Sequence, residues 1–472
     1  AKIKANNLKS KFRQEKMNNI TRKQRVIIPS KPLTEKYTPV PSKQKEQKKV
    51  IIKSEFYDPK AKSNLSFMEF LTGPVKGNVN ILSSSQFVPP PATSDTIRVG
   101  LLLPLTGPNA GLGGAMLNAT KLAMFDFADL RFELLIHDTK GDKNIAMQAS
   151  EMAIGDGASL IIGPLLSPSV KAASIAARAA NVPILAFSND QTVAGQGVFT
   201  FGFFPDAQVK RVIRYANLQG ISRYAVLAPR NDYGFNIVKS LKDVTSQTGS
   251  SVTVIKFYDP FNGDYSEVVK KLGDYDRRRQ ALLNQRASLK MAGGELADKA
   301  LKRLENVQTL GDLPFDALLV ADGGNRLKSI AALLPFYGID TDKIKILGTG
   351  QWDEAGIGKE PALVGAWFAA PPPKSRVRFE TQYIKAFKTA PPRLATLAYD
   401  AVALAAIFVK NGESQVFSID ALTESNGFLG RDGIFRLMPN GTTDRGLAVL
   451  QVGIDSNKMI SDAPKAFGIS IN

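Results

Sequence analysis

The 472-residue chain contains no cysteine, which excludes disulfide bonds, thiolate metal sites and cysteine nucleophiles. Its single histidine, His137, rules out a site built from several histidines, and its place at the end of an apolar stretch favours a structural role. No apolar run reaches roughly 18 residues, so we expect no transmembrane helix. No Gly-x-Ser-x-Gly nucleophile motif occurs. These absences predict a protein that is not an enzyme.

The glycine-rich stretch that follows the first apolar segment also lacks the signatures of nucleotide binding. Residues 111–116 read GLGGAM, without the third glycine of Gly-x-Gly-x-x-Gly, and no Gly-Lys-Ser/Thr follows. We therefore expect no nucleotide cofactor. The absence of cysteine and the single histidine also predict no metal site. The pattern instead predicts a turn that leads into a helix from about Gly114.

Positive charge is concentrated in the N-terminal part of the chain. Residues 1–95 hold 19 Lys and Arg against 7 Asp and Glu, a net +12 of the total of +18. Residues 1–63 are too polar to form a core and are predicted to be a disordered basic arm. Residues 64–95 combine a short apolar island with a proline-rich linker. The arm is compatible with a solvated tail, with contact to an anionic membrane surface, or with contact to a partner.

The residues after Ala1 lack the apolar core of a signal peptide. A start at Ala instead of Met is compatible with a leader that has been removed. Because the chain has no cysteine, we expect no lipid anchor on an N-terminal cysteine.

From Thr96 to the end, the chain is predicted to form one α/β domain of two doubly wound, Rossmann-like lobes. Apolar strands that alternate with amphipathic helices indicate parallel sheets with helices on both faces. The first lobe is predicted over about 96–215 and the second over about 220–370. The helix at 391–412 and the strands at 432–438 and 445–453 are expected to be crossover and edge elements.

Residues 275–307 interrupt the alternation of strands and helices. They are highly charged, have helical spacing and contain Gly293–Gly294 in the middle. We predict a helical hairpin inserted in the second lobe, as either a solvated surface excursion or an element that docks to a partner.

Small polar residues follow the predicted strands, at the edge of a parallel sheet where ligands bind. Hydroxyl groups and the N–H groups at helix starts suit a carboxylate or another small anion. Each of these residues can also simply cap the helix that follows, and the sequence leaves this alternative open. The lobes lack a basic and aromatic patch, so we expect no nucleic-acid partner. The candidate ligand-binding residues are Thr106, Gly107, Asn109, Ser167, Ser169, Ser188, Asn189, Tyr233, Asp322, Gln351 and Trp352.

Four segments, 97–123, 161–190, 231–241 and 398–406, resemble type I periplasmic binding proteins of the branched-chain amino acid receptor class. The resemblance extends from about Thr96 to the C-terminus. It implies that the loops at Ser167 and at Ser188–Asn189 hold an amino acid carboxylate. It also implies that Tyr233 and an acidic residue of the second lobe close over the rest of the ligand.

A narrower resemblance rests on residues 315–340 and 345–354, with the phrases LLPFYG and GTGQWD, and on the helical insertion upstream. These segments are similar to penicillin-binding-protein activators of the LppC type. The resemblance implies a periplasmic regulator that stimulates a peptidoglycan synthase by contact. The alternative is a solute-binding protein of an ABC-type uptake system for an amino acid or a similar carboxylate. Enterobacterial activators carry a helical-repeat N-terminal domain and a lipid anchor, and this chain matches neither.

Overall fold

The computed structural model describes residues 50–52, 96–128, 130–354, 356–412 and 416–467. The predicted basic arm and linker lie outside these residues, apart from strand β1 (Val50–Ile52). This strand pairs antiparallel with β3 (Phe132–Asp138), although the sequence predicts disorder over 1–63. Three consecutive β-branched residues favour an extended strand and explain the difference.

The first lobe is built on sheet A, which has the strand order β1-β3-β2-β4-β5-β6. All pairs except β1–β3 are parallel. The parallel strands therefore follow the 2-1-3-4-5 order of a doubly wound fold, whose switch point lies between β2 and β4. These strands are β2 (Ile97–Leu103), β3, β4 (Ala158–Ile162), β5 (Ile184–Ala186) and β6 (Val198–Thr200).

The second lobe repeats this arrangement in sheet B, with the order β16-β15-β11-β10-β9-β7-β8. Its parallel part, β8-β7-β9-β10-β11, again follows the 2-1-3-4-5 order, with the switch point between β7 and β9. Two antiparallel strands complete one edge. The strands are β7 (Arg223–Pro229), β8 (Ser251–Tyr258), β9 (Ala317–Val320), β10 (Lys345–Gly348), β11 (Trp367–Ala370), β15 (Ala448–Gln451) and β16 (Lys458–Ser461).

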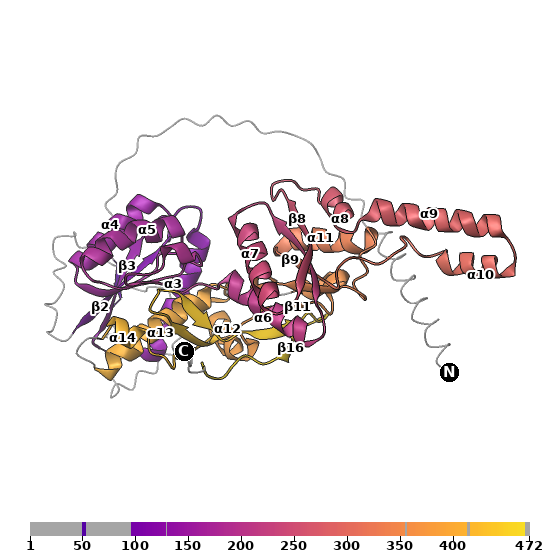
Figure 1. Cartoon of the computed structure of the whole chain (residues 1–472). Coiled ribbons are helices and arrows are strands. Elements are labelled where there is room, and N and C mark those ends of the chain that lie inside the picture. The colour runs from indigo at the N-terminus through magenta and orange to yellow at the C-terminus, as the bar shows by residue number, and fades with distance from the viewer. Residues whose placement is uncertain (1–49, 53–95, 129, 355, 413–415, 468–472) are drawn as a thin grey trace, which may run out of the picture. The chain divides into compact units, whose positions relative to one another are not determined.

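Helices cover both faces of each parallel sheet, and the apolar side chains of alternate strand positions explain why (Figure 1). In sheet A, Leu101 packs with α3 and α13, whereas Leu102 packs with α4 and α5. In sheet B, Val226 packs with α6 and α7, whereas Leu227 packs with α8 and α11. The helices are α3 (Ala110–Phe127), α4 (Lys143–Gly155), α5 (Ser167–Ala179), α6 (Pro205–Leu218), α7 (Asp232–Gln247), α8 (Ser266–Leu272), α11 (Gly324–Phe336) and α13 (Ala395–Asn411).

The prediction of an α/β fold with two doubly wound lobes is confirmed. One lobe boundary differs from the sequence prediction, because α6 packs in the second lobe although the first was predicted to run to about 215. Val209 and Val212 of α6 lie in the same buried cluster as Tyr224 of β7. The amphipathic pattern of α6 predicts a helix, but it does not specify which sheet the apolar face covers.

The chain crosses between the lobes near the C-terminus as well. Helices α12 (Pro373–Phe387) and α13 belong to the core of the first lobe. A small antiparallel sheet C joins β12 (Phe428–Gly430), β13 (Gly433–Leu437) and β14 (Thr443–Arg445) beside them. The chain then enters sheet B as β15. The crossover helix expected at 391–412 is α13. The strands expected at sheet edges lie inside their sheets instead, because β14 follows and covers β13 in sheet C, and β16 follows and covers β15 in sheet B.

Two helices occupy the segment predicted to be an inserted hairpin, and they extend away from sheet B (Figure 1). These are α9 (Tyr275–Ala292) and α10 (Glu295–Leu304). Arg278 fixes the base of α9, because its guanidinium donates to the backbone carbonyls of Gly273, Gly311 and Gly338. Among the described residues, no helix is long and apolar enough to cross a membrane.

Candidate functional site

The topology places the predicted site residues at the carboxyl ends of strands around the switch point of each lobe. Thr106 follows β2, and Ser167 follows β4, its neighbour in sheet A. Tyr233 follows β7, and Asp322 follows β9, its neighbour in sheet B. Adjacent parallel strands that diverge at their ends leave the loops of a doubly wound sheet exposed to ligands. The structure therefore places these predicted residues at the carboxyl ends of neighbouring strands in both sheets.

The loop after β2 is held by Asp138, the last residue of β3. The Thr106 hydroxyl donates to Asp138 Oδ2 at 2.6 Å, and the backbone N–H groups of Leu105 and Lys140 each donate to Oδ1 at 2.8 Å. Partial burial opposes ionisation, but the hydrogen bonds from Thr106 and from these N–H groups outweigh it and hold the pKa of Asp138 below its ordinary value. Thr106 is therefore engaged in shaping the loop.

The glycines of this loop serve close packing of backbone. A Cβ atom on Gly113 would lie 2.0 Å from the carbonyl oxygen of Pro104, so α3 can approach the end of β2 only with glycine there. Gly234 plays the same part in the second lobe, where a Cβ would lie 1.9 Å from the carbonyl oxygen of Pro229. Helix α3 begins at Ala110, one turn before the predicted start at Gly114, because Gly111 and Gly113 already belong to the helix.

The start of α5 brings Ser167 and Ser188 together. Their hydroxyl groups are 3.0 Å apart, and the Ser188 Oγ also accepts a hydrogen bond from the Asp190 N–H. Partial burial opposes ionisation of Asp190, but hydrogen bonds from Thr192 and Ser167 and the charge of Lys171 outweigh it and lower its pKa. A carboxylate of the chain itself therefore lies where the resemblance places the carboxylate of an amino acid. The Ser169 side chain is buried.

In the second lobe, Tyr233 is paired across the sheet edge with the residue that follows β10. Its hydroxyl lies 3.1 Å from the hydroxyl of Thr349. Burial raises the pKa of Tyr233 to about 12, and the negative charge of Asp322 acts in the same direction. The phenol therefore stays neutral at physiological pH.

Asp322 is almost completely buried, with 3% of its surface exposed, and its carboxylate is fully engaged. Arg326 binds it through two nitrogens, Nε at 2.8 Å and Nη2 at 3.1 Å. The Gly323 N–H donates to Oδ1 at 2.8 Å, and the Tyr258 hydroxyl donates to Oδ2. Burial and the charge and hydrogen bond of Asp322 raise the pKa of Tyr258 far above its ordinary value.

The structure places Trp352 in the core of the second lobe, where it has no exposed surface. Its Nε1 donates to the backbone carbonyl of Asp322 at 2.8 Å, and its ring packs on Phe368. Sequence position after β10 suggested a ligand contact, but the side chain points inward, against Gly348, where any Cβ would collide with the ring. The neighbouring Gln351 is exposed.

Four of the predicted residues keep groups that a ligand could reach. The side chains of Asn109, Asn189 and Gln351 make no hydrogen bond to another described residue, and Gly107 is exposed. The helix-capping alternative fails for Asn109, because its side chain makes no capping bond to α3. The sequence reasoning missed Asp138, Tyr258 and Arg326. The available signal was the position of Arg326, four residues after Asp322 and in the first turn of the helix that follows it.

Within the described residues, no group of three or more His, Asp or Glu side chains is arranged to hold a metal ion. His137 is buried in β3, with 7% of its surface exposed.

Residues 96–458 match the family model described as periplasmic binding protein, so the chain belongs to this family. Membership of the family implies an extracytoplasmic location. The family is one of binding proteins.

Three relatives illustrate the range of similarity. An uncharacterized protein of Rickettsia prowazekii is 24% identical over 228 residues, which cover 48% of this chain and 60% of that protein. The penicillin-binding protein activator LpoA of Glaesserella parasuis is 27% identical over 166 residues, 34% of this chain and 27% of LpoA. The crystal structure of a putative branched-chain amino acid ABC transporter from Rhodospirillum rubrum has a TM-score of 0.62 at 18% identity, covering 77% of this chain and 100% of that one. The chain thus spans less than two thirds of the curated relatives that it matches.

Proposed function

We propose that this protein is a non-enzymatic periplasmic regulator that stimulates a peptidoglycan synthase by direct contact. One observation carries the proposal: the groups that would hold the two charged ends of an amino acid, Ser167, Ser188 and Asp322, are already paired with groups of the chain itself. A receptor needs such groups to be available, because a ligand must replace any hydrogen bond that it displaces.

The carboxylate end of an amino acid would meet the start of α5. There, Ser167 contacts both Ser188 and Asp190, and the ionised Asp190 repels a second carboxylate. The N-terminal end of α5 favours negative charge, and the chain supplies that charge itself.

The ammonium end of an amino acid would meet an acidic residue of the second lobe. Asp322 is the acidic residue predicted for this role, and Arg326 neutralises it with two hydrogen bonds. A ligand ammonium would have to displace the guanidinium from a buried carboxylate. The ammonium would have to replace the two charge-assisted hydrogen bonds of the guanidinium, which opposes ligand binding.

The α9–α10 hairpin supports a role in protein contact. Only Arg278 and Leu282 of α9 and Ala297 of α10 are buried, so most of the hairpin surface faces away from the core. Met291 and Leu296 at its tip are 82% and 84% exposed. Exposed apolar side chains on a projecting, basic helix suit an interface with another protein. The similarity to LpoA supports a penicillin-binding protein as that partner.

The first test compares the two candidate functions in one series. We expect that none of the twenty amino acids at 1 mM raises the melting temperature, because Ser167, Ser188 and Asp322 are already paired within the chain. A ligand that did bind would stabilise the fold by mass action. We expect the protein to accelerate glycan polymerisation by a penicillin-binding protein of the same organism. A shift of several degrees with an amino acid, together with no stimulation, would overturn the proposal.

The second candidate is a solute-binding protein of an uptake system. Three amide side chains that make no hydrogen bond to a described residue, Asn109, Asn189 and Gln351, favour it. Its expected ligand is a small carboxylate that uses amides and backbone N–H groups, without an ammonium site. An acid library in the same thermal assay tests this candidate separately from the synthase assay.

A second prediction concerns the hairpin tip. Met291 and Leu296 are replaced together by Ser. The concentration of this protein needed for half-maximal synthase stimulation should rise at least about tenfold, because each substitution removes an apolar contact at the interface. Both side chains are exposed, so the melting temperature should stay unchanged. Leu218→Ser on α6 is the matched control, because Leu218 is 81% exposed and lies outside the hairpin. Equal stimulation by the unmodified protein, the double variant and Leu218→Ser would show that the hairpin tip is not part of the interface.

A further inference from the structure

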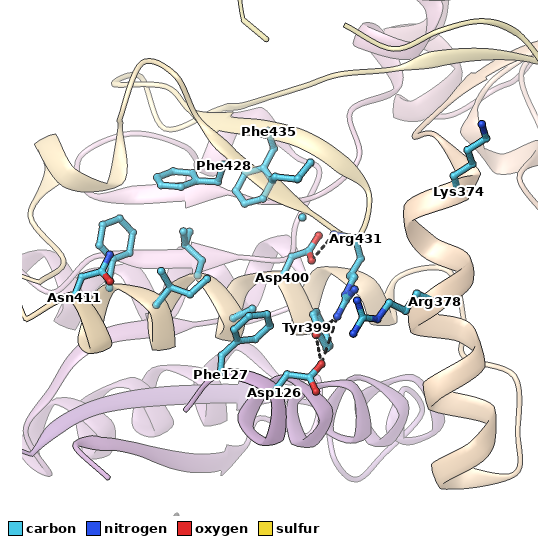
Figure 2. A pocket seen from close by; sticks show the side chains of 16 residues that line it. Asp126, Phe127, Lys374, Arg378, Tyr399, Asp400, Asn411, Phe428, Arg431 and Phe435 are labelled. Carbon is cyan, nitrogen blue, oxygen red and sulfur yellow. Dashed lines mark hydrogen bonds and ion pairs between the residues drawn. The ribbon is translucent and has the colours of Figure 1, made fainter. Parts of the chain in front are cut away.

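The first lobe contains a cavity of about 840 Å³ that is separate from the strand-end loops. It lies between the end of α3, helices α12 and α13, and the β12–β13 hairpin (Figure 2). None of the residues predicted to bind a ligand lines it. Its volume falls within the range of small-molecule sites, roughly 300–1,000 Å³.

One end of the cavity carries an excess of positive charge. Figure 2 shows Arg378 and Arg431 converging beside Tyr399 and Asp126. Arg431 stacks over the Tyr399 ring at 4.5 Å and forms a 3.4 Å ion pair with Asp126. Arg378, and Lys374 one turn before it on α12, have no ion-pair partner among the described residues. Two cations therefore remain available at this end after Asp126 has neutralised the third.

The wall at this end also contains a buried carboxyl group with an unused oxygen. Asp400 has 3% of its surface exposed; its Oδ1 accepts from the Arg431 N–H at 2.8 Å, and its Oδ2 has no hydrogen-bond partner. Burial and the charge of the neighbouring Asp432 raise the pKa of Asp400 to about 7. The group consequently opposes the positive charge less than an ordinary aspartate would.

The rest of the cavity is apolar. Phe127, Leu404, Phe408, Phe428 and Phe435 line it, and Ile407 is 40% exposed there. The lining residues of α13 recur every three or four positions from Tyr399 to Asn411, so they form one face of the helix. At 1.5 Å per residue this face is about 18 Å long. That length exceeds a single aromatic ring and suits an extended chain of methylene groups.

We propose that this cavity binds a single-chain amphipathic anion, such as a long-chain fatty acid. The head group contacts Arg378 and Arg431 of the cationic end, with Lys374 at its rim, and the acyl chain runs along the apolar face of α13 toward Asn411. A neutral amphipathic molecule cannot pair with the cationic end, and a short carboxylate leaves the apolar face of α13 uncovered. Both should therefore bind more weakly. The inference is independent of the proposed contact with a synthase.

The test is titration calorimetry of the full chain with dodecanoate up to 1 mM, in parallel with octanoate, dodecyl phosphate and uncharged dodecyl maltoside. We expect saturable binding of dodecanoate with one site per chain. Octanoate should bind at least about tenfold more weakly, because each methylene contributes up to about fourfold. Dodecyl maltoside should not bind. A general anion site binds dodecyl phosphate as well as dodecanoate, whereas a site shaped for a carboxylate binds only dodecanoate.

Two variants assign the binding to this cavity. The double variant Lys374→Ala and Arg378→Ala should weaken dodecanoate at least about tenfold, because charge-assisted hydrogen bonds are lost. Ile407→Gln should also weaken dodecanoate binding, because it places a polar amide on the apolar face of α13. Lys385→Ala with Lys388→Ala is the matched control, since these residues are also exposed near the end of α12 but outside the cavity. Melting temperatures verify that each variant is folded.

The proposal is overturned by any of three results. These are absence of heat with dodecanoate at 1 mM, equal binding of dodecanoate and dodecyl maltoside, and unchanged affinity in the Lys374/Arg378 variant. Binding only to vesicles that contain an anionic phospholipid, without binding of free dodecanoate, would also overturn it, because that result indicates a membrane surface.

Discussion

Trp352→Ala should lower the free energy of unfolding by about 3–5 kcal/mol, the usual cost of truncating a fully buried aromatic side chain. The indole has no exposed surface, packs on Phe368 and donates to the carbonyl of Asp322. Its removal leaves a cavity in the core of the second lobe and an unpaired carbonyl. Chemical denaturation followed by circular dichroism measures the change.

The matched control for this variant is the adjacent Gln351→Ala. Gln351 is exposed and makes no side-chain hydrogen bond to another described residue, so its truncation should change the stability by no more than about 0.5 kcal/mol. Had Trp352 been a ligand contact, as its sequence position predicted, the two variants would be similarly stable. A loss below about 1 kcal/mol for Trp352→Ala would contradict its burial in the core.

Arg445→Met should also destabilise the fold by about 3–5 kcal/mol, because it breaks a buried charge cluster. Arg445 has 8% of its surface exposed, and its guanidinium stacks on the rings of Phe201, Phe203 and Phe435 at 4.7–5.3 Å. It donates to the Phe201 carbonyl at 2.8 Å. The carboxyl groups of Asp400 and Asp432 are both buried near it.

Two further variants separate charge from packing at this position. Adding Asp400→Asn to Arg445→Met should restore part of the lost stability, because the carboxyl group left without its cation is removed. Arg277→Met breaks an ion pair whose arginine is 73% exposed, and should change the stability by at most about 0.5 kcal/mol. If Arg445→Met and Arg277→Met were equally stable, the buried cluster would not contribute to folding. Urea denaturation of all four proteins gives the comparison.

The sequence was informative about fold because its local patterns agree with one another. Runs such as 99–103 and 224–228 carry no charged side chain and are buried throughout, as strands covered on both faces must be, and both form central parallel strands. Strand ends identified in this way were enough to locate the loops with Thr106, Ser167, Tyr233 and Asp322 at the switch points. The same patterns did not show that α6 belongs to the second sheet, since an amphipathic helix covers any apolar face.

The cavity of the first lobe had no signal in the sequence. Its walls come from α3, α12, α13 and the β12–β13 hairpin, elements that are separated by up to about three hundred residues. The periodicity of α13 from Tyr399 to Asn411 is equally well explained by burial in the core. Only the packed chain shows that one part of this face lines an open space with Arg378 and Lys374 at its rim.

The sequence by itself determined the class of protein. The absence of cysteine, of repeated histidine and of nucleotide motifs excludes several chemistries, and the alternation of strands and helices specifies two doubly wound lobes. Only the tertiary structure decided which of the candidate residues are available. Asp322 and Trp352 follow their strands as ligand contacts do, but Arg326 neutralises the first and the core encloses the second. Local sequence patterns indicate which residues follow a strand. The partner of a side chain depends on contacts between segments that are distant in the sequence, and local patterns do not encode these contacts.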